Sequence, residues 1–204
     1  MTLTLRSRLA VFLALAAVMA ATRLNHFGLV PDASWAVFFV AGFYLRGSAR
    51  WAFPGLMALA VAVDYVVITG SGQSFWSHYC VSPGYWFLLP AHLSLWAGGA
   101  LLRRLATLPR PAFLAGGAVL LVASVALCHL FAQGGFYWLS DVVATPTFAG
   151  WAKNYADWFM PYLGTTALYV GLAVVVHVLV KRVRRAVIGW LQDRIDRRLQ
   201  GLAA

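Results

Sequence analysis

The sequence predicts an all-α, polytopic membrane protein built as a bundle of six transmembrane helices, and three observations lead to this fold class. Hydrophobic residues make up 62% of the 204 residues, charged residues only 11%, and the mean hydropathy is +0.76. A soluble domain carries roughly 25% charged residues, and a disordered chain is far more polar. Long uncharged stretches and a one-sided distribution of basic residues are the other two observations.

Six uncharged apolar stretches are the predicted spans, because a helix needs about 20 residues to cross a bilayer. The first follows Arg6 and Arg8 and has a cleaved signal peptide as its alternative reading, but we expect it to be retained because no soluble domain follows it. Pro31 and Asp32 interrupt the second. The stretches cover residues 9–22, 27–45, 51–70, 85–102, 112–134 and 161–180.

The basic residues give the predicted orientation. With six spans the connections alternate between two sides, and 14 of the 16 Lys and Arg residues then fall on one side. Only Arg23 and Lys153 fall on the other. This bias predicts that both termini are cytoplasmic, and it accounts for the net charge of +10 without nucleic acid as a partner.

We expect two parts, a six-span membrane domain over residues 1–180 and a basic cytoplasmic helix over residues 181–204. A basic helix with one apolar face lies on anionic lipid at the inner leaflet. A solvated stub and a partner-docking helix are the alternatives. The apolar residues that recur every three or four positions are Val183, Val187, Trp190, Leu191, Ile195 and Leu199.

The outer side of the bundle is predicted to hold a binding pocket. Its longest loops, residues 71–84 and 135–160, are rich in aromatic and hydrogen-bonding side chains. Asp64 lies roughly 20 Å along the third span from Trp51, in the outer half of the bilayer, and His92 and His129 reach the same depth. Such groups are costly in a span unless they face a cavity or a partner. We therefore expect the three to converge on an outward-open polar cavity, with a structural hydrogen bond as the alternative for Asp64 and packing for the histidines.

Cys80 is the sharpest candidate for chemistry. Pro83 and Gly84 suit the centre of a type II turn, with a positive φ at glycine, which would bring the cysteine to the mouth of the fourth span. Three roles remain open: a disulfide with Cys128, a nucleophile with His78 or His129 as its base, or a ligand to a metal. A lone cysteine with scattered histidines does not match a zinc motif, so a metal would arrive already chelated.

The whole chain resembles the small solitary cobalamin-uptake proteins of the BtuM type, relatives of the substrate-binding S components of energy-coupling-factor transporters. The resemblance rests on residues 23–26, 77–80 and 83–85, together with the six spans. It implies an S-component-like bundle in the bacterial inner membrane that takes up cobalamin (vitamin B12) through an outward-facing pocket. It also implies that Cys80 is an axial ligand of the cobalt with the cobalamin base displaced. The pocket-lining candidates are Tyr85, Asp64, Tyr79 and His78.

The resemblance has implications for chemistry and partners as well. Thiolate ligation by Cys80 would favour loss of cyanide from cyanocobalamin, so this residue is also the candidate catalytic group. S components dock a coupling subunit through small residues of the first helix, and Ala10, Ala14, Ala17 and Ala21 offer that spacing here. The sequence contains no GxxxxGK[ST] motif for ATP. Two alternative functions are a scaffold anchored by the basic tail, and a membrane thiol or haem-type redox protein that uses Cys80, Cys128, His92 and His129.

Overall fold

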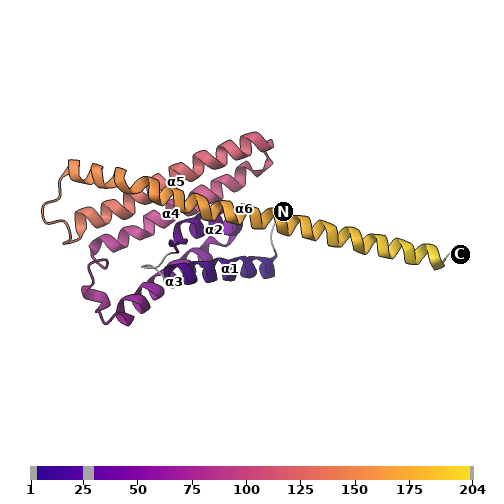
Figure 1. Cartoon of the computed structure of the whole chain (residues 1–204), viewed down its shortest axis with the longest axis horizontal. Coiled ribbons are helices and arrows are strands. Elements are labelled where there is room, and N and C mark those ends of the chain that lie inside the picture. The colour runs from indigo at the N-terminus through magenta and orange to yellow at the C-terminus, as the bar shows by residue number, and fades with distance from the viewer. Residues whose placement is uncertain (1–3, 25–29, 203–204) are drawn as a thin grey trace. The chain divides into compact units, whose positions relative to one another are not determined.

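The computed structural model describes residues 4–24 and 30–202, and this part of the chain is all-α (Figure 1). Short 3-10 turns cover Arg46–Ser48, Phe75–Ser77, Pro83–Phe87 and Leu105–Thr107. The chain divides into two compact units, Met1–Val170 and Gly171–Ala204. The α-helices are α1 (Leu5–Arg23), α2 (Ser34–Leu45), α3 (Ala49–Gly70), α4 (Leu88–Arg104), α5 (Arg110–Leu139) and α6 (Phe148–Leu202).

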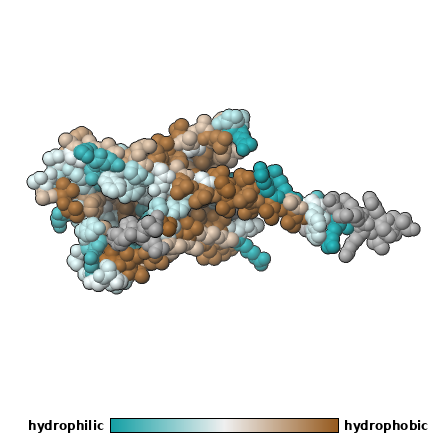
Figure 2. Space-filling model, viewed as in Figure 1, coloured by the Kyte–Doolittle hydropathy of each residue, from teal (hydrophilic) through white to brown (hydrophobic). Residues whose placement is uncertain are grey.

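Four helical stretches are long and apolar enough to cross a membrane: Leu5–Arg23, Ser34–Gly70, Arg110–Leu139 and Phe148–Trp190. The second of these contains both α2 and α3. Figure 2 shows hydrophobic residues over the middle of the first unit and hydrophilic ones gathered toward its ends. An apolar outer surface of this kind is suited to lipid. These four candidate spans indicate a multi-pass membrane protein.

The predicted second span differs from the structure. Helix α2 begins only at Ser34, and its 12 residues rise about 18 Å, well short of a hydrocarbon core of about 30 Å. Asp32 sets this late start, because its Oδ1 accepts hydrogen bonds from the Ser34 backbone N at 2.8 Å and from Ser34 Oγ at 2.6 Å. Residues 27–29 of the predicted stretch lie outside the described residues.

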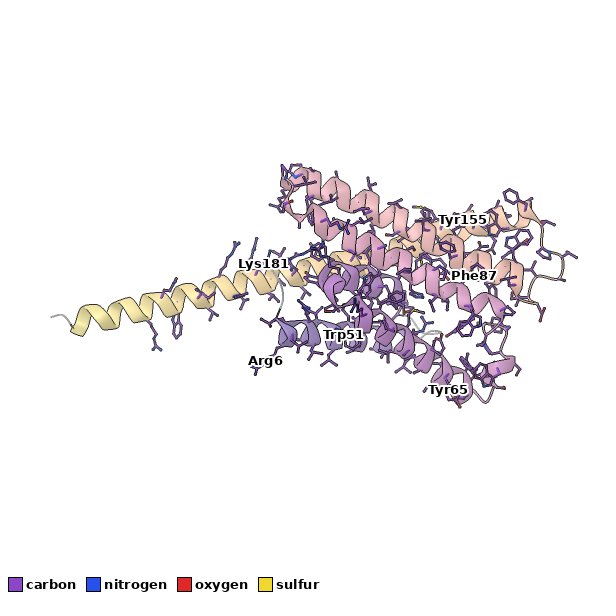
Figure 3. The ribbon with its side chains drawn as sticks, turned by 180° about the vertical axis from the view of Figure 1, so that it is seen from behind. Arg6, Trp51, Tyr65, Phe87, Tyr155 and Lys181 are labelled. Carbon is purple, nitrogen blue, oxygen red and sulfur yellow. The ribbon has the colours of Figure 1, made fainter. Side chains whose placement is uncertain are left out.

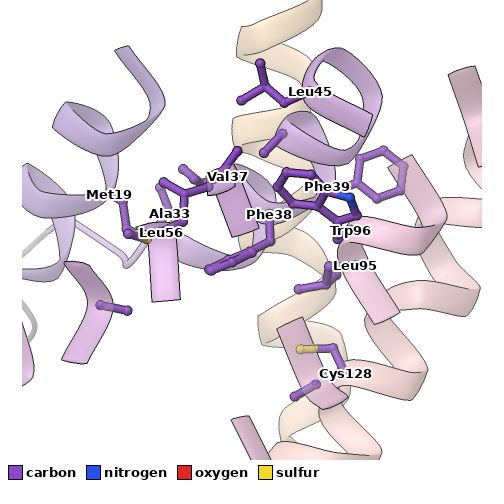
Figure 4. Packing of buried hydrophobic residues seen from close by; sticks show 14 of the residues in the cluster. Met19, Ala33, Val37, Phe38, Phe39, Leu45, Leu56, Leu95, Trp96 and Cys128 are labelled. Atoms are coloured by element: carbon purple, nitrogen blue, oxygen red, sulfur yellow. The ribbon is translucent and has the colours of Figure 1, made fainter. Parts of the chain in front are cut away.

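Helix α2 forms the centre of the hydrophobic core (Figure 4). Nine of its 12 residues are buried, as expected for a helix that is apolar around its whole circumference. Phe38 and Phe39 are the largest of its fully buried side chains. Residues of α1, α3, α4 and α5 pack around them, among them Met19, Leu56, Leu95 and Val125.

Glycines bring α2 and α4 into backbone contact. A Cβ added at Gly42 would clash with the backbone of Trp96, and one added at Gly99 would clash with the backbone of Phe39. Small residues at such positions let two helices approach closely. The short helix α2 is therefore fixed against α4 at these two glycines.

The two ends of the first unit differ in charge. Figure 3 shows Arg6 and Trp51 toward one end, and Tyr65, Phe87 and Tyr155 toward the other. The basic end is tied together by contacts that the structure defines. Arg8 Nη1 donates to Ser48 Oγ at 3.3 Å, and the Arg103 guanidinium lies 5.1 Å from the centre of the Phe43 ring. Carboxylates and aromatic residues occupy the opposite end, which we call the loop end.

The predicted long loop over residues 135–160 is wrong. Helix α5 continues to Leu139 and α6 begins at Phe148, so only residues 140–147 connect them. The aromatic and polar residues that led to a loop assignment lie instead on helical turns beyond the apolar stretches. Gln133 Nε2 donates to Asn154 Oδ1 at 2.7 Å, which joins α5 to α6 at this level.

The second unit is the C-terminal part of α6. Helix α6 includes the basic segment and ends at Leu202. Val183, Val187 and Trp190 are exposed, and the Arg194 guanidinium lies 4.6 Å from the centre of the Trp190 ring. The side chains of Leu191, Ile195 and Leu199 lie outside the described residues.

Candidate functional site

The candidate site is built by the segment that connects α3 to α4. Helix α3 ends at Gly70, and Gly72 then reverses the chain with a φ of +80°, a conformation that favours glycine. Phe75 fixes the 3-10 turn Phe75–Ser77, because its ring is buried between the rings of Tyr65 and Tyr85. The ring centroids of Tyr65 and Tyr85 lie 5.5 Å and 6.3 Å from that of Phe75.

The predicted type II turn at Pro83 and Gly84 is wrong. These residues open a 3-10 helix, and Ser82 caps it by accepting a hydrogen bond at Oγ from the Gly84 backbone N at 3.2 Å. Among the described residues Gly72, and not Gly84, has a positive φ. Gly84 is needed for a different reason, since a Cβ there would clash with the backbone of Gly135 in α5. The turn is therefore fixed by packing against α5.

One cavity of about 490 Å³ contains all five side chains that the sequence singled out. These are Asp64 from α3, His78, Tyr79 and Cys80 from the connecting segment, and Tyr85 from the 3-10 turn Pro83–Phe87. We call this the cysteine cavity. Its other lining residues are Arg23, Val67, Ile68, Ser71, Gln73, Gly84, Leu88, Ala132, Phe136 and Tyr162.

Arg23 organises the polar side of the cysteine cavity. It donates to both oxygens of Asp64, from Nε at 2.6 Å and from Nη2 at 2.8 Å. Its Nη1 donates to Asp32 Oδ2 at 2.8 Å and to Ser34 Oγ at 3.1 Å. Asp64 Oδ2 also accepts a hydrogen bond from the Tyr85 hydroxyl at 2.7 Å. This arginine–carboxylate network joins the end of α1, the start of α2, the C-terminal third of α3 and the connecting segment.

The Asp64 network fixes the orientation of the Tyr85 hydroxyl. A tyrosine hydroxyl is protonated at physiological pH, so Tyr85 acts as a donor to Asp64 Oδ2. Asp64 accepts structural hydrogen bonds from Arg23 and Tyr85 and also lines the cavity, so the two roles considered for it from the sequence are compatible.

Cys80 is half-buried and lies near the opposite charges of Asp64 and Arg23. Burial is the main cause that raises the pKa of its thiol; a hydrogen bond with Tyr79 lowers it, and the charge of Asp64 raises it further. The thiol is therefore protonated near neutral pH, and a metal would have to displace that proton. His78 acts on the backbone, since its Nδ1 accepts a hydrogen bond from the Cys80 N at 3.3 Å.

Cys128 does not take part in this site. Its side chain is fully buried in the core among residues of α2 and α4, and both cysteines are free thiols in the structure. The disulfide reading thus has no counterpart in the described structure. Within the described residues, no group of three or more His, Cys, Asp or Glu side chains could hold a metal ion. Cys80 offers one soft ligand.

The expected convergence of Asp64, His92 and His129 on one cavity is wrong. His92 is 2% exposed and lines a different cavity. His129 is 1% exposed and lies in an aromatic cluster, with ring centroids 4.5 Å from Tyr155 and 5.2 Å from Tyr162. Its Nε2 is 3.1 Å from the Tyr155 carbonyl oxygen. The helix rotation that separates these side chains cannot be derived from depth alone.

Arg23 is the site residue that sequence reasoning missed as a cavity residue. The signal was present, because it is one of only two basic residues on the predicted outer side and ends the first apolar stretch. A buried arginine at that depth needs a carboxylate partner, and Asp32 and Asp64 are the acidic residues at its level. Asn25 and His26, which follow it, lie outside the described residues.

No family model matches this chain, and no curated protein matches it. No family is therefore identified by these comparisons, and the resemblance to cobalamin-uptake proteins stays a prediction.

Proposed function

We propose that this protein binds cobalamin and carries it across the bacterial inner membrane, with the Cys80 thiolate as an axial ligand of the cobalt. The observation that carries the proposal is the cysteine cavity, which gathers Cys80 with Tyr79, Tyr85 and Asp64 at the loop end. A lone thiol cannot hold a bare metal ion, but it can complete the coordination of a metal that a macrocycle already holds.

The lining of the cavity suits a corrin ring. The ring is broad and apolar with amide groups along its edge, and the cavity combines apolar walls such as Val67 and Phe136 with polar groups such as Gln73 and Ser71. Its volume of about 490 Å³ is typical of sites for drug-sized ligands. Cobalamin is larger, so we expect much of the ring to extend beyond the cavity, with the cobalt toward Cys80.

The proposal includes six membrane crossings with both termini in the cytoplasm. Two short helices, α2 and the 17-residue α4, would complete the six together with their flanking segments. The basic end of the first unit then faces the cytoplasm, as positive charge does in membrane proteins, and the cysteine cavity faces outward. The C-terminal basic helix would lie on the lipid of the inner leaflet.

A coupling subunit is part of the proposal as a partner for α1. Ala10, Ala14, Ala17 and Ala21 are exposed, whereas Met19 and Thr22 of the same helix are buried. An exposed row of small residues allows close packing by another transmembrane helix. Co-purification of such a subunit, and its loss when Ala14 and Ala17 are changed to Leu, would support this part.

Cyanide removal is the catalytic part of the proposal. The Cys80 thiol loses its proton to solvent, a sulfur–cobalt bond replaces the bond from the cobalamin base, and cyanide leaves with the electron pair of its bond to cobalt. Cobalt keeps its oxidation state, and no reductant is consumed. Electron donation from sulfur weakens the bond to the opposite ligand, which is the reason to expect this loss.

Two experiments test the proposal. In a strain that lacks its own inner-membrane cobalamin importer, the unmodified chain should restore growth on scarce cobalamin, Cys80→Ser should not, and the buried-thiol control Cys128→Ala should. The purified protein should change the absorption spectrum of cyanocobalamin, and Cys80→Ser should abolish that change. Absence of rescue by the unmodified chain, or a tightly retained haem chromophore, would contradict the proposal.

A further inference from the structure

A second cavity, of about 370 Å³, borders the cysteine cavity. The two cavities share Arg23, Tyr85 and Leu88 in their walls. The connecting segment divides between them, because residues 78–80 line the cysteine cavity whereas Val81 and Ser82 line the second. Tyr85 is held in this shared wall by its hydrogen bond to Asp64. A ligand group that is released next to Cys80 therefore lies close to the second cavity, because the next residue, Val81, lines it.

The walls of the second cavity suit a flat aromatic ring. Phe75, Trp76 and Trp86 lie around it, and the two tryptophans are 81% and 73% exposed, so a ligand can reach their faces. Aromatic side chains of this kind stack on planar bases, whatever the identity of the base. Met57, Ala60, Val61 and Leu89 complete an apolar lining.

His92 adds one hydrogen-bond acceptor to this apolar lining. Its Nδ1 is 2.7 Å from the Leu88 carbonyl oxygen, and because a carbonyl only accepts, Nδ1 carries the hydrogen. In a neutral imidazole the other nitrogen, Nε2, is then an acceptor. Nε2 is buried and has no hydrogen-bond partner. His92 Nε2 thus lacks a hydrogen-bond donor, which a hydroxyl group of a ligand would supply.

We propose that the second cavity is a subsite for the nucleotide loop of the corrinoid, with the base between the aromatic walls and a ribose hydroxyl donating to His92 Nε2. This inference rests on the proposed function. When the Cys80 sulfur takes the position of the base on cobalt, the base is released on the face of the ring that Cys80 occupies, toward the protein. An acyl chain of a lipid would fill the apolar walls but offers no donor to His92.

A truncated ligand tests the subsite. Cobinamide has the same corrin ring and cobalt but lacks the base and ribose, and it also has no base to displace from the cobalt. The ratio of the two affinities in the unmodified protein is therefore the reference value, and variants of the subsite should lower it by roughly tenfold for the loss of one stacked base. Cys80→Ser should weaken binding of both ligands.

Variants of the subsite should act on cobalamin alone. Trp86→Ala and His92→Leu should each lower the preference for cobalamin over cobinamide relative to the unmodified protein, while the affinity for cobinamide stays unchanged. His92→Gln, which keeps an acceptor, should retain part of the preference. Trp138→Ala, a change at an exposed tryptophan outside both cavities, is the matched control and should retain all of it.

The outcomes separate the two proposals. Unchanged affinity for cobalamin in both Trp86→Ala and His92→Leu would overturn the subsite and leave the proposed function standing. An equal loss of both affinities in Trp86→Ala would also overturn it, because the residue would then act on the corrin ring. Failure to bind either corrinoid would overturn the proposed function itself.

Discussion

Arg23 at the end of α1 holds both carboxylate oxygens of Asp64 in the C-terminal third of α3, with donor–acceptor distances of 2.6 and 2.8 Å. This paired geometry is the strongest that a guanidinium and a carboxylate form. The same guanidinium holds Asp32 ahead of α2, and Asp64 holds Tyr85. Segments more than 40 residues apart in the sequence are thus joined through two side chains, and one wall of the cysteine cavity depends on them.

Asp64→Asn should destabilise the protein by about 3 kcal/mol, because removing one partner of a mostly buried ion pair leaves the other charge without full compensation. Thermal or denaturant unfolding in detergent measures this. Asp157→Asn is the matched control, since Asp157 forms an exposed pair with Lys153, and such pairs contribute below about 1 kcal/mol. Equal losses for the two variants would show that the network does not stabilise the fold.

Tyr85→Phe should interact with Asp64→Asn when the two are combined. The Tyr85 hydroxyl donates to Asp64, so Tyr85→Phe should lower the free energy of unfolding only a little in a protein that already carries Asp64→Asn. We expect a coupling free energy of about 1 kcal/mol in a double-mutant cycle, as for residues in direct hydrogen-bond contact. Unfolding free energies of the four proteins give this value. Strictly additive effects would mean that the hydrogen bond contributes nothing to stability.

The membrane class and five of the residues that line the cysteine cavity could be predicted from the sequence. The class follows from composition, and the five residues follow from local side-chain chemistry together with the family resemblance. Cys80, Tyr79 and His78 are neighbours in the chain, so a single turn brings them together. Asp64 was identified because a carboxylate in an apolar helix is costly unless it faces a cavity or a partner. These inferences needed no knowledge of how helices pack.

The features that failed depend on packing. The late start of α2 is set by the side chain of Asp32, and Gly84 serves a backbone contact with Gly135. A hydropathy profile contains no information on either of these contacts. The His129 ring lies against Tyr155, because rotation about a helix axis follows from neighbouring side chains. Such relations between distant residues require the three-dimensional structure.

Gly84→Ala should both destabilise the fold and weaken ligand binding. The added methyl group would press on the backbone of Gly135, and overpacking of this kind costs about 1–3 kcal/mol. Displacement of this turn would also move Tyr85, the next residue. Gly164→Ala in α6 is the control, since a Cβ there meets nothing within 4 Å and alanine favours a helix by about 1 kcal/mol. Equal unfolding temperatures for the two variants would show that the contact with Gly135 does not limit the size of residue 84.

The thiol of Cys80 should ionise only above the pH at which an ordinary cysteine does. Burial raises its pKa, so near neutral pH little thiolate is present, and the thiolate is the form that reacts with iodoacetamide. Alkylation of Cys80 in the folded protein should therefore be slower than in the denatured chain at the same pH. The rate should rise about tenfold per pH unit and reach its plateau at a higher pH in the folded protein. Mass spectrometry locates the modified residue.

Asp64→Asn should shift this profile of Cys80 to lower pH, because the charge of Asp64 contributes to the raised pKa of the thiol. Cobalt ligation should follow the same dependence, since binding must release the thiol proton. Affinity for the corrinoid then rises with pH up to the pKa of Cys80 and stays constant beyond it. A profile for the folded protein that coincides with that of the denatured chain would contradict the buried, protonated thiol on which this expectation depends.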